Sequence, residues 1–595
     1  MSIETTVKDD RSPAAEPSPA LPRTRRTLAA RLRAMNSFDT VSLVLAGVLV
    51  VLVCLPLVRV VINMFYKDGR FTLEAIQRTL AIEDLGKLII DTVVVVMASS
   101  LLAVVIGFLL AWANTRTDAK FGILNEVFPY LPFLLPPIAG AVGWTMLLSP
   151  QAGLLNSWLR DLLGLIGIQL ESGPFDINSW YGLILVYTFY AVPYVYMNVS
   201  AAMQSLDSSL EEASRISGAS ALTTLRRVTL PALAPAIGAG FLLCTWFGFG
   251  MFSIAQIIGT PAGIDMIPVR IVKLLTFTYP PDEDLAIGLS AIVVLFVGLS
   301  YYVQYRILRN SRFSSIGGKG THHTVTKLGI WRPVVRGAVL LYVGVSTVLP
   351  MFALFIVSLN GYWTANIQWD SLSLDAFRTA LVDDPKTREA FANSMTLGLV
   401  GGVIGITVAA MVSLYIAQHR SRMTLGLDAA IKLPASISNM VIAVGILLLL
   451  ARPPFSLGGT WLILLIGYLA LYLPQASIAA DAAVATVGKE LGEASEVSGA
   501  RKWKTFRRVF LPLMLPGLVG GFALLFVRII GDLTASAILS GTNNVVVGFR
   551  ILEVFNGGSY ALLAALASTL VIVTAVILVA VLWLSKRMGV ARSRR

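Results

Sequence analysis

Two short segments of the sequence carry the same acidic, small and basic residues in the same order. Residues 210–235 read LEEASRISGASALTTLRRVTLPALAP, and residues 491–516 read LGEASEVSGARKWKTFRRVFLPLMLP. At a constant offset of 281, 14 of these 26 positions are identical. Each segment offers a glutamate, a glycine suited to a tight turn, and an Arg-Arg pair that can bind acidic groups. We therefore predict a helix–turn–helix that presents a charged surface to another protein or to lipid headgroups.

The plain alternative for such a segment is an amphipathic helix that lies on the membrane surface without a partner. Two copies that keep the same Glu-Ala-Ser, Gly and Arg-Arg favour a shared function over this alternative. The candidate contact residues are Glu212, Ala213, Gly218, Arg226 and Arg227 in the first copy and Glu493, Ala494, Gly499, Arg507 and Arg508 in the second.

A second charged pair lies inside an apolar stretch. Arg528 and Asp532 are four residues apart, so on a helix they share one face and can form an ion pair. Ionisable residues inside a membrane usually face protein or a water-filled path. At the same offset their counterparts are Phe247 and Met251, so the charged pair occurs in one copy only. Two interpretations stay open: a polar patch on a translocation path, or a self-neutralised pair that locks helices together.

The residue types that are scarce narrow the chemistry further. The sequence has three histidines and two cysteines, none at metal-ligand spacing, so neither a metal site nor a disulfide framework is expected. No G-x-x-x-x-G-K-S/T phosphate loop occurs in the sequence. ATP binding and hydrolysis are therefore not expected in this chain.

The elements that position these residues are predicted to be membrane helices. Only 14% of the 595 residues are charged and 56% are hydrophobic, whereas a soluble chain carries about 25% charged residues. Apolar stretches near the ~20 residues needed to cross a bilayer recur along the chain. We place twelve spans at residues 40–65, 88–113, 123–148, 181–203, 235–258, 284–307, 334–358, 394–417, 427–450, 461–483, 516–540 and 560–585. Asp91 and Asn393, near the outer ends of equivalent second spans, are expected to cap helices.

The basic residues predict the orientation of the chain. With a cytoplasmic N-terminus, the cytoplasmic segments hold 31 of the 47 Lys and Arg residues, and the opposite loops hold 12. This is the bias that the positive-inside rule describes. Both termini are therefore expected in the cytoplasm. The net charge of +13 then reflects membrane orientation, and no nucleic acid is expected as a partner.

The repeat divides the predicted all-α polytopic membrane protein into two homologous halves of six spans each. We expect a disordered basic tail that is not a signal peptide at 1–38, a first half at 39–308, a cytoplasmic linker at 309–333, a second half at 334–587 and a basic tail at 588–595. The repeated segments then lie between the fourth and fifth spans of each half, on the cytoplasmic side.

The two segments resemble the EAA loop of binding-protein-dependent ABC importer permeases. The family pattern is Glu-Ala-Ala, three residues, Gly, nine residues, an apolar residue, one more residue, then Leu-Pro. The two loops end in Val228 to Pro231 and Val509 to Pro512 as the pattern requires, while Ser214 and Ser495 replace the second alanine. The linker residues 317–320 (Gly-Gly-Lys-Gly) and the stretch 531–536 resemble motifs of fused ferric-iron-type permeases. The resemblance covers roughly residues 40–587.

This resemblance implies the type I ABC importer permease architecture in a bacterial inner membrane. It implies that each loop docks on one of two cytoplasmic ATPase subunits, which hold ATP and Mg²⁺, and that an extracytoplasmic binding protein delivers the solute. Glu212 and Glu493 are then acidic contacts to the ATPase, the glycines form the turn, and the arginines flank the interface or meet lipid headgroups. Ferric iron is the solute implied first. Phosphonate, sugar phosphate, thiamine and polyamine stay open.

Two other function classes are weighed against an importer permease. An ion-coupled secondary transporter with parallel repeats needs coupling residues near the bilayer midplane in both halves, and Arg528 and Asp532 occur in one half only. A membrane-embedded enzyme needs a catalytic constellation within the spans, which three histidines outside the spans do not supply. The importer permease is therefore the function that we predict.

Overall fold

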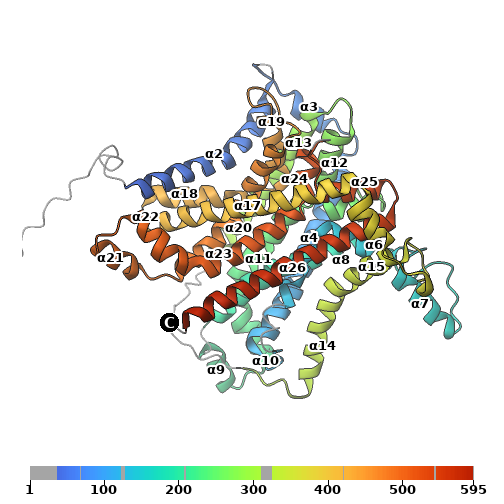
Figure 1. Cartoon of the computed structure of the whole chain (residues 1–595). Coiled ribbons are helices and arrows are strands. Elements are labelled where there is room, and N and C mark those ends of the chain that lie inside the picture. Colours follow the sequence, from blue (N-terminus) through green and yellow to red (C-terminus); the bar gives the residue numbers. More distant parts are fainter. Residues whose placement is uncertain are drawn as a thin grey trace, which may run out of the picture.

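The computed structural model describes residues 36–67, 69–121, 128–206, 209–309, 325–419, 421–541 and 544–593. The predicted N-terminal tail therefore lies almost entirely outside the described residues. Residues 310–324 of the predicted linker also lie outside them. Within the described residues the only strands are the short antiparallel pair β1 (Tyr66–Lys67) and β2 (Arg70–Phe71). Long helices run side by side through the molecule (Figure 1). The fold is thus built from helices.

The two halves repeat one order of helices. The long or apolar helices of the first half are α2 (Ser37–Phe65), α4 (Leu85–Arg116), α6 (Pro137–Leu148), α8 (Trp180–Ser205), α11 (Leu230–Gly250) and α13 (Glu283–Arg309). Those of the second half are α14 (Arg332–Val343) with α15 (Leu349–Asn360), α17 (Pro385–Gln418), α19 (Asn439–Leu450), α20 (Trp461–Ala485), α23 (Leu511–Ile530) and α26 (Tyr560–Ser593). Helix α26 continues through the start of the segment expected to be the C-terminal tail.

Shorter helices lie at the two ends of the bundle. At one end are α3 (Glu74–Leu80), α7 (Leu154–Leu165), α12 (Ile267–Val272), α16 (Asp375–Arg378) and α25 (Val547–Asn556). At the other end are α9 (Ser209–Ile216), α10 (Ala221–Thr224), α21 (Lys489–Val497) and α22 (Lys502–Thr505), together with the C-terminus (Figure 1). The repeated segments of both halves therefore share one end of the molecule, as the predicted orientation requires.

The prediction of twelve continuous spans is wrong for two of them. The described residues contain ten helices long and apolar enough to cross a membrane, or eleven if one bent pair is counted. In the predicted span 123–148 the apolar helix begins only at Pro137, after a 3-10 stretch at Phe128–Leu134. In the span 427–450, α18 (Arg422–Lys432) and the 3-10 turn that follows it meet α19 at a bend of 103°.

Proline chemistry explains the first break, because Pro137 disfavours helical geometry in the residue before it, Pro136. At the second break Leu433, which precedes Pro434, is still helical (φ −52°, ψ −40°), and the helical backbone is lost only between Pro434 and Asn439. The residues just before the apolar helices, Pro136 and Ser438, have ψ angles of 139° and 129°, so the backbone there is not helical. Each half therefore has a short apolar helix, α6 or α19, entered through an irregular segment.

The first helix of each half packs on the opposite half. Helix α2 lies along α17, α18 and α19, and α15 packs against α6 (Figure 1). Glycines allow these crossings, because a Cβ atom on Gly445 would stand 2.5 Å from the Pro56 carbonyl oxygen. A Cβ on Gly143 would stand 2.5 Å from the Pro350 carbonyl oxygen in the same way. The halves are thus interlocked by matching backbone contacts.

Gly445→Ala is expected to loosen this interlock. An added methyl at 2.5 Å from a backbone oxygen forces the helices apart, and such overpacking costs about 1–3 kcal/mol. The measurement is the thermal unfolding midpoint of the purified chain in one detergent. Gly426→Ala on α18 is the matched control, since its Cβ would meet nothing within 4 Å. An unchanged midpoint for Gly445→Ala would contradict the role of this crossing.

Candidate functional site

The two EAA loops, residues 210–235 and 491–516, have the same backbone turn. Gly218 has φ +83° and Gly499 has φ +77°, a left-handed conformation that glycine adopts without strain. Beyond each glycine, the N–H of the next residue returns to a carbonyl in the last helical turn, from Ala219 to Ser214 and from Ala500 to Ser495, both at 3.1 Å. This is the Schellman ending of a helix. The glycines therefore occupy the turn between the two short helices of each loop.

The serine that departs from the family pattern has a structural role in both loops. Ser214 Oγ lies 2.9 Å from Thr224 Oγ1, and Ser495 Oγ lies 2.9 Å from Thr505 Oγ1. Each hydrogen bond joins the helix before the glycine to the helix after it. The two arms of each loop are therefore tied together, so that they can move as one unit.

The outer surface of each loop is free of intramolecular cover. Glu212 and Glu493 are exposed, and so are Ala213, Ala494 and the four arginines Arg226, Arg227, Arg507 and Arg508. Two apolar side chains at equivalent positions are also exposed, Ile216 at 87% and Val497 at 89%. Each loop therefore exposes one acidic, one apolar and two basic side chains at matching positions. Such a mixed surface is suited to contact with another protein.

The two loops differ in what lies beneath them. Under the first loop, Glu211 is buried and accepts a hydrogen bond from Thr229 Oγ1 at 2.9 Å. Arg116, only 2% exposed, places its Nε 3.8 Å from the same carboxylate and donates from Nη2 to the Met203 carbonyl. The corresponding position to Glu211 in the second loop is Gly492, which packs against the Phe510 ring. One loop thus rests on a buried ion pair and the other on an aromatic contact.

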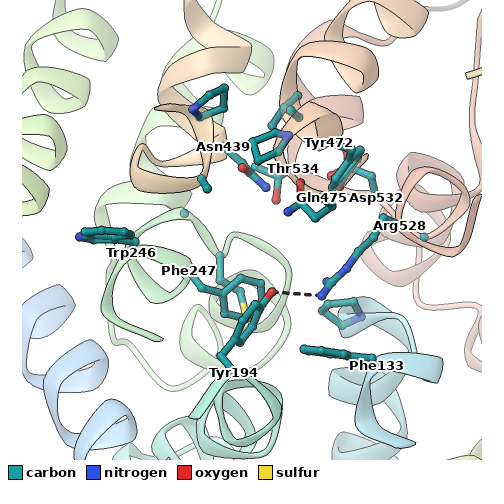
Figure 2. A pocket seen from close by; sticks show the side chains of 18 of the residues that line it. Phe133, Tyr194, Trp246, Phe247, Asn439, Tyr472, Gln475, Arg528, Asp532 and Thr534 are labelled. Carbon is teal, nitrogen blue, oxygen red and sulfur yellow. Dashed lines mark hydrogen bonds between the residues drawn. The ribbon is translucent and has the colours of Figure 1, made fainter. Parts of the chain in front are cut away.

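A cavity of about 200 Å³ lies between the two halves. Its aromatic side comes from the first half, with Phe133, Tyr194 and Phe247, and its polar side comes from the second half, with Asn439, Gln475 and Thr534 (Figure 2). Two pairs of lining residues occupy equivalent positions in the two halves, because the offset of 281 pairs Tyr194 with Gln475 and Phe247 with Arg528. Equivalent positions of the two halves therefore line the cavity, but they carry different side chains.

Arg528 and Asp532 both line this cavity, but they do not form the predicted ion pair within the described residues. Helix α23 ends at Ile530, so the four-residue spacing is not helical and does not bring the side chains together. Arg528 Nη2 instead donates to Tyr194 Oη at 3.0 Å, and its guanidinium lies 4.6 Å from the centre of the Phe133 ring. Each side chain therefore makes its hydrogen bonds elsewhere, and no salt bridge joins the two within the described residues.

The Asp532 carboxylate accepts hydrogen bonds from its own segment and from α20. Its Oδ1 accepts the Ala535 N–H at 2.8 Å, and its Oδ2 accepts the Tyr472 hydroxyl at 2.7 Å. These bonds fix the start of α24 (Thr534–Leu539) against α20. The carboxylate is 7% exposed and has a structural role.

The expectation that Asp91 and Asn393 cap helices is also wrong. The N-cap residues of α4 and α17 are Asp84 and Asp384, so Asp91 and Asn393 lie about two turns inside the helices. Asn393 Nδ2 donates to the Val545 carbonyl at 3.0 Å instead.

Each half has an equivalent ion pair at the end of the bundle opposite the EAA loops, and the sequence analysis missed both. Arg270 on α12 binds Asp84 at 2.5 Å, and Arg550 on α25 binds Asp384 at 2.8 Å. Burial alone would raise the pKa of Asp384, but hydrogen bonds from Thr387 and Arg550 outweigh it and hold that pKa below its ordinary value. The offsets of these pairs, 280 and 300, differ from 281. An alignment of the halves that admits gaps would have found them.

Asp384→Asn is expected to remove an acid-sensitive part of the stability. Because the folded pKa of Asp384 is lowered, its stabilising contribution is complete above the unfolded value of about 3.9 and is lost as the pH falls through the folded value. We expect about 1–3 kcal/mol at neutral pH, as for hydrogen bonds to charged groups. The measurement is the unfolding midpoint at pH 7 and at about pH 2, below the unfolded pKa, with Asp370→Asn as control. Equal acid sensitivity of the wild type and Asp384→Asn would count against this.

Comparison with known proteins gives a consistent result for both halves. Residues 103–312 and 401–590 each match the family described as binding-protein-dependent transport system inner membrane component. The ferric transport system permease protein FbpB of Actinobacillus pleuropneumoniae is 24% identical over 540 residues, covering 89% of this chain and 75% of that protein. The Fe(3+)-transport system permease protein FbpB 2 of Haemophilus influenzae is 25% identical over 407 residues, covering 68% of this chain and 77% of that protein. Among solved structures, a chain of a bacterial alginate ABC transporter in complex with a periplasmic protein aligns at a TM-score of 0.35 and 19% identity, covering 44% of this chain and 98% of that one.

Proposed function

Since the chain belongs to the family of binding-protein-dependent transport system inner membrane components, we propose how this ABC importer permease couples to its partners and which solute it carries. It is a multi-pass inner-membrane protein of two fused halves.

The coupling surface is the pair of EAA loops. The observation that carries this part is that both loops expose the same glutamate and the same apolar position around an identical turn. Each loop docks on one of two cytoplasmic ATPase subunits, with Glu212 or Glu493 contacting the ATPase and the arginine pairs flanking the interface. ATP and Mg²⁺ are bound and used in those subunits.

The transport cycle follows from two interlocked halves with one cavity between them. When the ATPase subunits close on ATP, they draw the two loops together and the cavity opens toward the docked binding protein. When they separate after hydrolysis, the cavity opens inward. This is a two-state equilibrium that nucleotide and ligand bias. Both termini face the cytoplasm, which agrees with the C-terminus and the EAA loops sharing one end of the bundle (Figure 1).

Ferric iron is the proposed solute. Support comes from the fused two-half layout and from relatives named as ferric transport permeases at about 24% identity. Phosphonate, sugar phosphate, thiamine and polyamine are the alternatives. The test is uptake of ferric iron into proteoliposomes that hold the chain, its ATPase subunits and its binding protein. Uptake must need ATP and both partners; uptake driven by an ion gradient without the ATPase would instead favour a secondary transporter.

A further inference from the structure

The guanidinium of Arg528 is partly exposed in the cavity and forms no salt bridge with an acidic side chain among the described residues. The groups in direct contact with it are the Tyr194 hydroxyl and the Phe133 ring, both uncharged. In Figure 2 the guanidinium reaches from the second half across to Tyr194 of the first half. A guanidinium has five N–H donors in a planar fork, and the bond to Tyr194 uses one of them. The remaining donors can face an incoming solute.

The one carboxylate that lines the same cavity is not offered to a solute. Both oxygens of Asp532 already accept hydrogen bonds, from Ala535 and Ser536 on one side and from Tyr472 on the other. The side chain is almost fully buried, whereas Arg528 is partly exposed. Arg528 is therefore the charged group in the cavity whose hydrogen-bonding capacity is still open to a solute.

The remaining polar groups suit hydrogen bonds to oxygen atoms. Gln475 lies opposite Tyr194, and its Oε1 has no hydrogen-bond partner within the described chain. The Nε2 group of the same amide supplies the N–H donors that an oxyanion needs. Asn439 and Thr534 add an amide and a hydroxyl on the same side. By contrast, no group of three or more His, Cys, Asp or Glu side chains in the described residues could hold a metal ion. A bare metal cation would meet a guanidinium here and no set of ligands.

We propose that this cavity binds an oxyanion group of the passing solute through Arg528, with Gln475 beside it, so that the solute crosses the permease as an anion. The inference rests on the proposed transport function. A ferric ion then crosses only together with enough carboxylate or phosphate ligands to give the complex a net negative charge. A phosphonate or sugar phosphate satisfies the same site, whereas thiamine and polyamines, which are cations, do not.

The first experiment measures binding by the full chain in complex with its ATPase subunits, in one detergent. The probes are inorganic phosphate, citrate and ferric citrate, and the readout is the rise of the thermal unfolding midpoint with probe concentration. Arg528→Gln is expected to raise the apparent Kd for the oxyanions about tenfold or more, since charge-assisted hydrogen bonds are the strong ones. Arg528→Lys keeps the charge, so its apparent Kd is expected to lie between those of the wild type and Arg528→Gln. Arg388→Gln removes an exposed arginine elsewhere and is expected to bind as the wild type does.

Two outcomes would overturn the inference. One is Arg528→Gln binding the oxyanions as tightly as the wild type. The other is a wild-type complex that none of the three oxyanions stabilises. If Arg528→Gln does not fold, the comparison of Arg528→Lys with the wild type decides, because a lysine cannot bind an oxyanion through two parallel N–H groups.

Transport separates this inference from the solute assignment. If ferric citrate enters proteoliposomes equally well through the wild type and Arg528→Gln, the solute assignment stands and the inference fails. If a phosphorylated organic solute enters in place of iron, and Arg528→Gln blocks that uptake, the inference stands and the ferric assignment fails. Stimulation of ATP hydrolysis by the binding protein should persist in Arg528→Gln, because the EAA loops are unchanged.

Discussion

Replacing Glu212 and Glu493 together by lysine is expected to abolish assembly of the permease with its ATPase subunits. Both glutamates are exposed at the same place in matching loops. If they contact basic groups of the ATPase, reversing their charge turns two attractions into repulsions. Loss of one partner of a close interfacial charge pair costs about 2–5 kcal/mol. Two such losses would leave little complex at working concentrations.

Co-purification of the ATPase with the tagged permease measures this effect, and ATP hydrolysis in proteoliposomes gives a second readout. Glu83→Lys with Glu171→Lys makes the same change in charge away from the EAA loops and should leave assembly intact. The single variants test whether the loops are equivalent, because each should weaken one docking site. Normal co-purification of the double variant would remove the role given to these loops.

Arg116→Met is expected to have the second large effect. It leaves the buried Glu211 carboxylate beneath the first loop without its cation. Removing one partner of a buried ion pair costs about 3–5 kcal/mol. The change also removes the hydrogen bonds that hold the carbonyls of Met203 and Leu206 at the end of α8. We expect a lower unfolding midpoint and weaker stimulation of ATP hydrolysis by the binding protein.

The second half supplies the control for this prediction. Gln418 is the last residue of α17, as Arg116 is of α4, and its side chain is exposed, so Gln418→Met should change neither readout. Combining Arg116→Met with Glu211→Gln removes the stranded charge and should restore part of the stability. If Arg116→Met alone is as stable as the wild type, the buried pair does not support the first loop.

The repeat made the EAA loops predictable from sequence, because their turn depends on residues close together in the chain. Gly218 and Gly499 have the same left-handed φ, as two local copies of one motif should. The spans were predictable where the apolar run is unbroken. They failed at 123–148 and 427–450, where the backbone leaves helical geometry without interrupting the hydrophobicity.

The cavity could be predicted only in part, because its contacts join distant segments. Arg528 was identified as a candidate, but its partner Tyr194 lies 334 residues away in sequence, and Phe133 comes from yet another segment. The four-residue spacing to Asp532 suggested a helical pair, and only the end of α23 at Ile530 shows why none forms. Arg270 and Arg550 were missed because insertions shift the register between the halves.

The packing of α2 on the opposite half also sets the timing of biogenesis. Its partner α19 begins at Asn439, and Phe65 ends α2, so 439 − 65 = 374 residues are synthesised before the two can meet. At about 5–20 residues per second this interval is roughly 20–75 s. During that time the nascent α2 lacks its neighbours from the second half, α17, α18 and α19. Its valines at 44, 48 and 51, which still face outward in the finished protein, suit a helix that must first be stable alone in the bilayer.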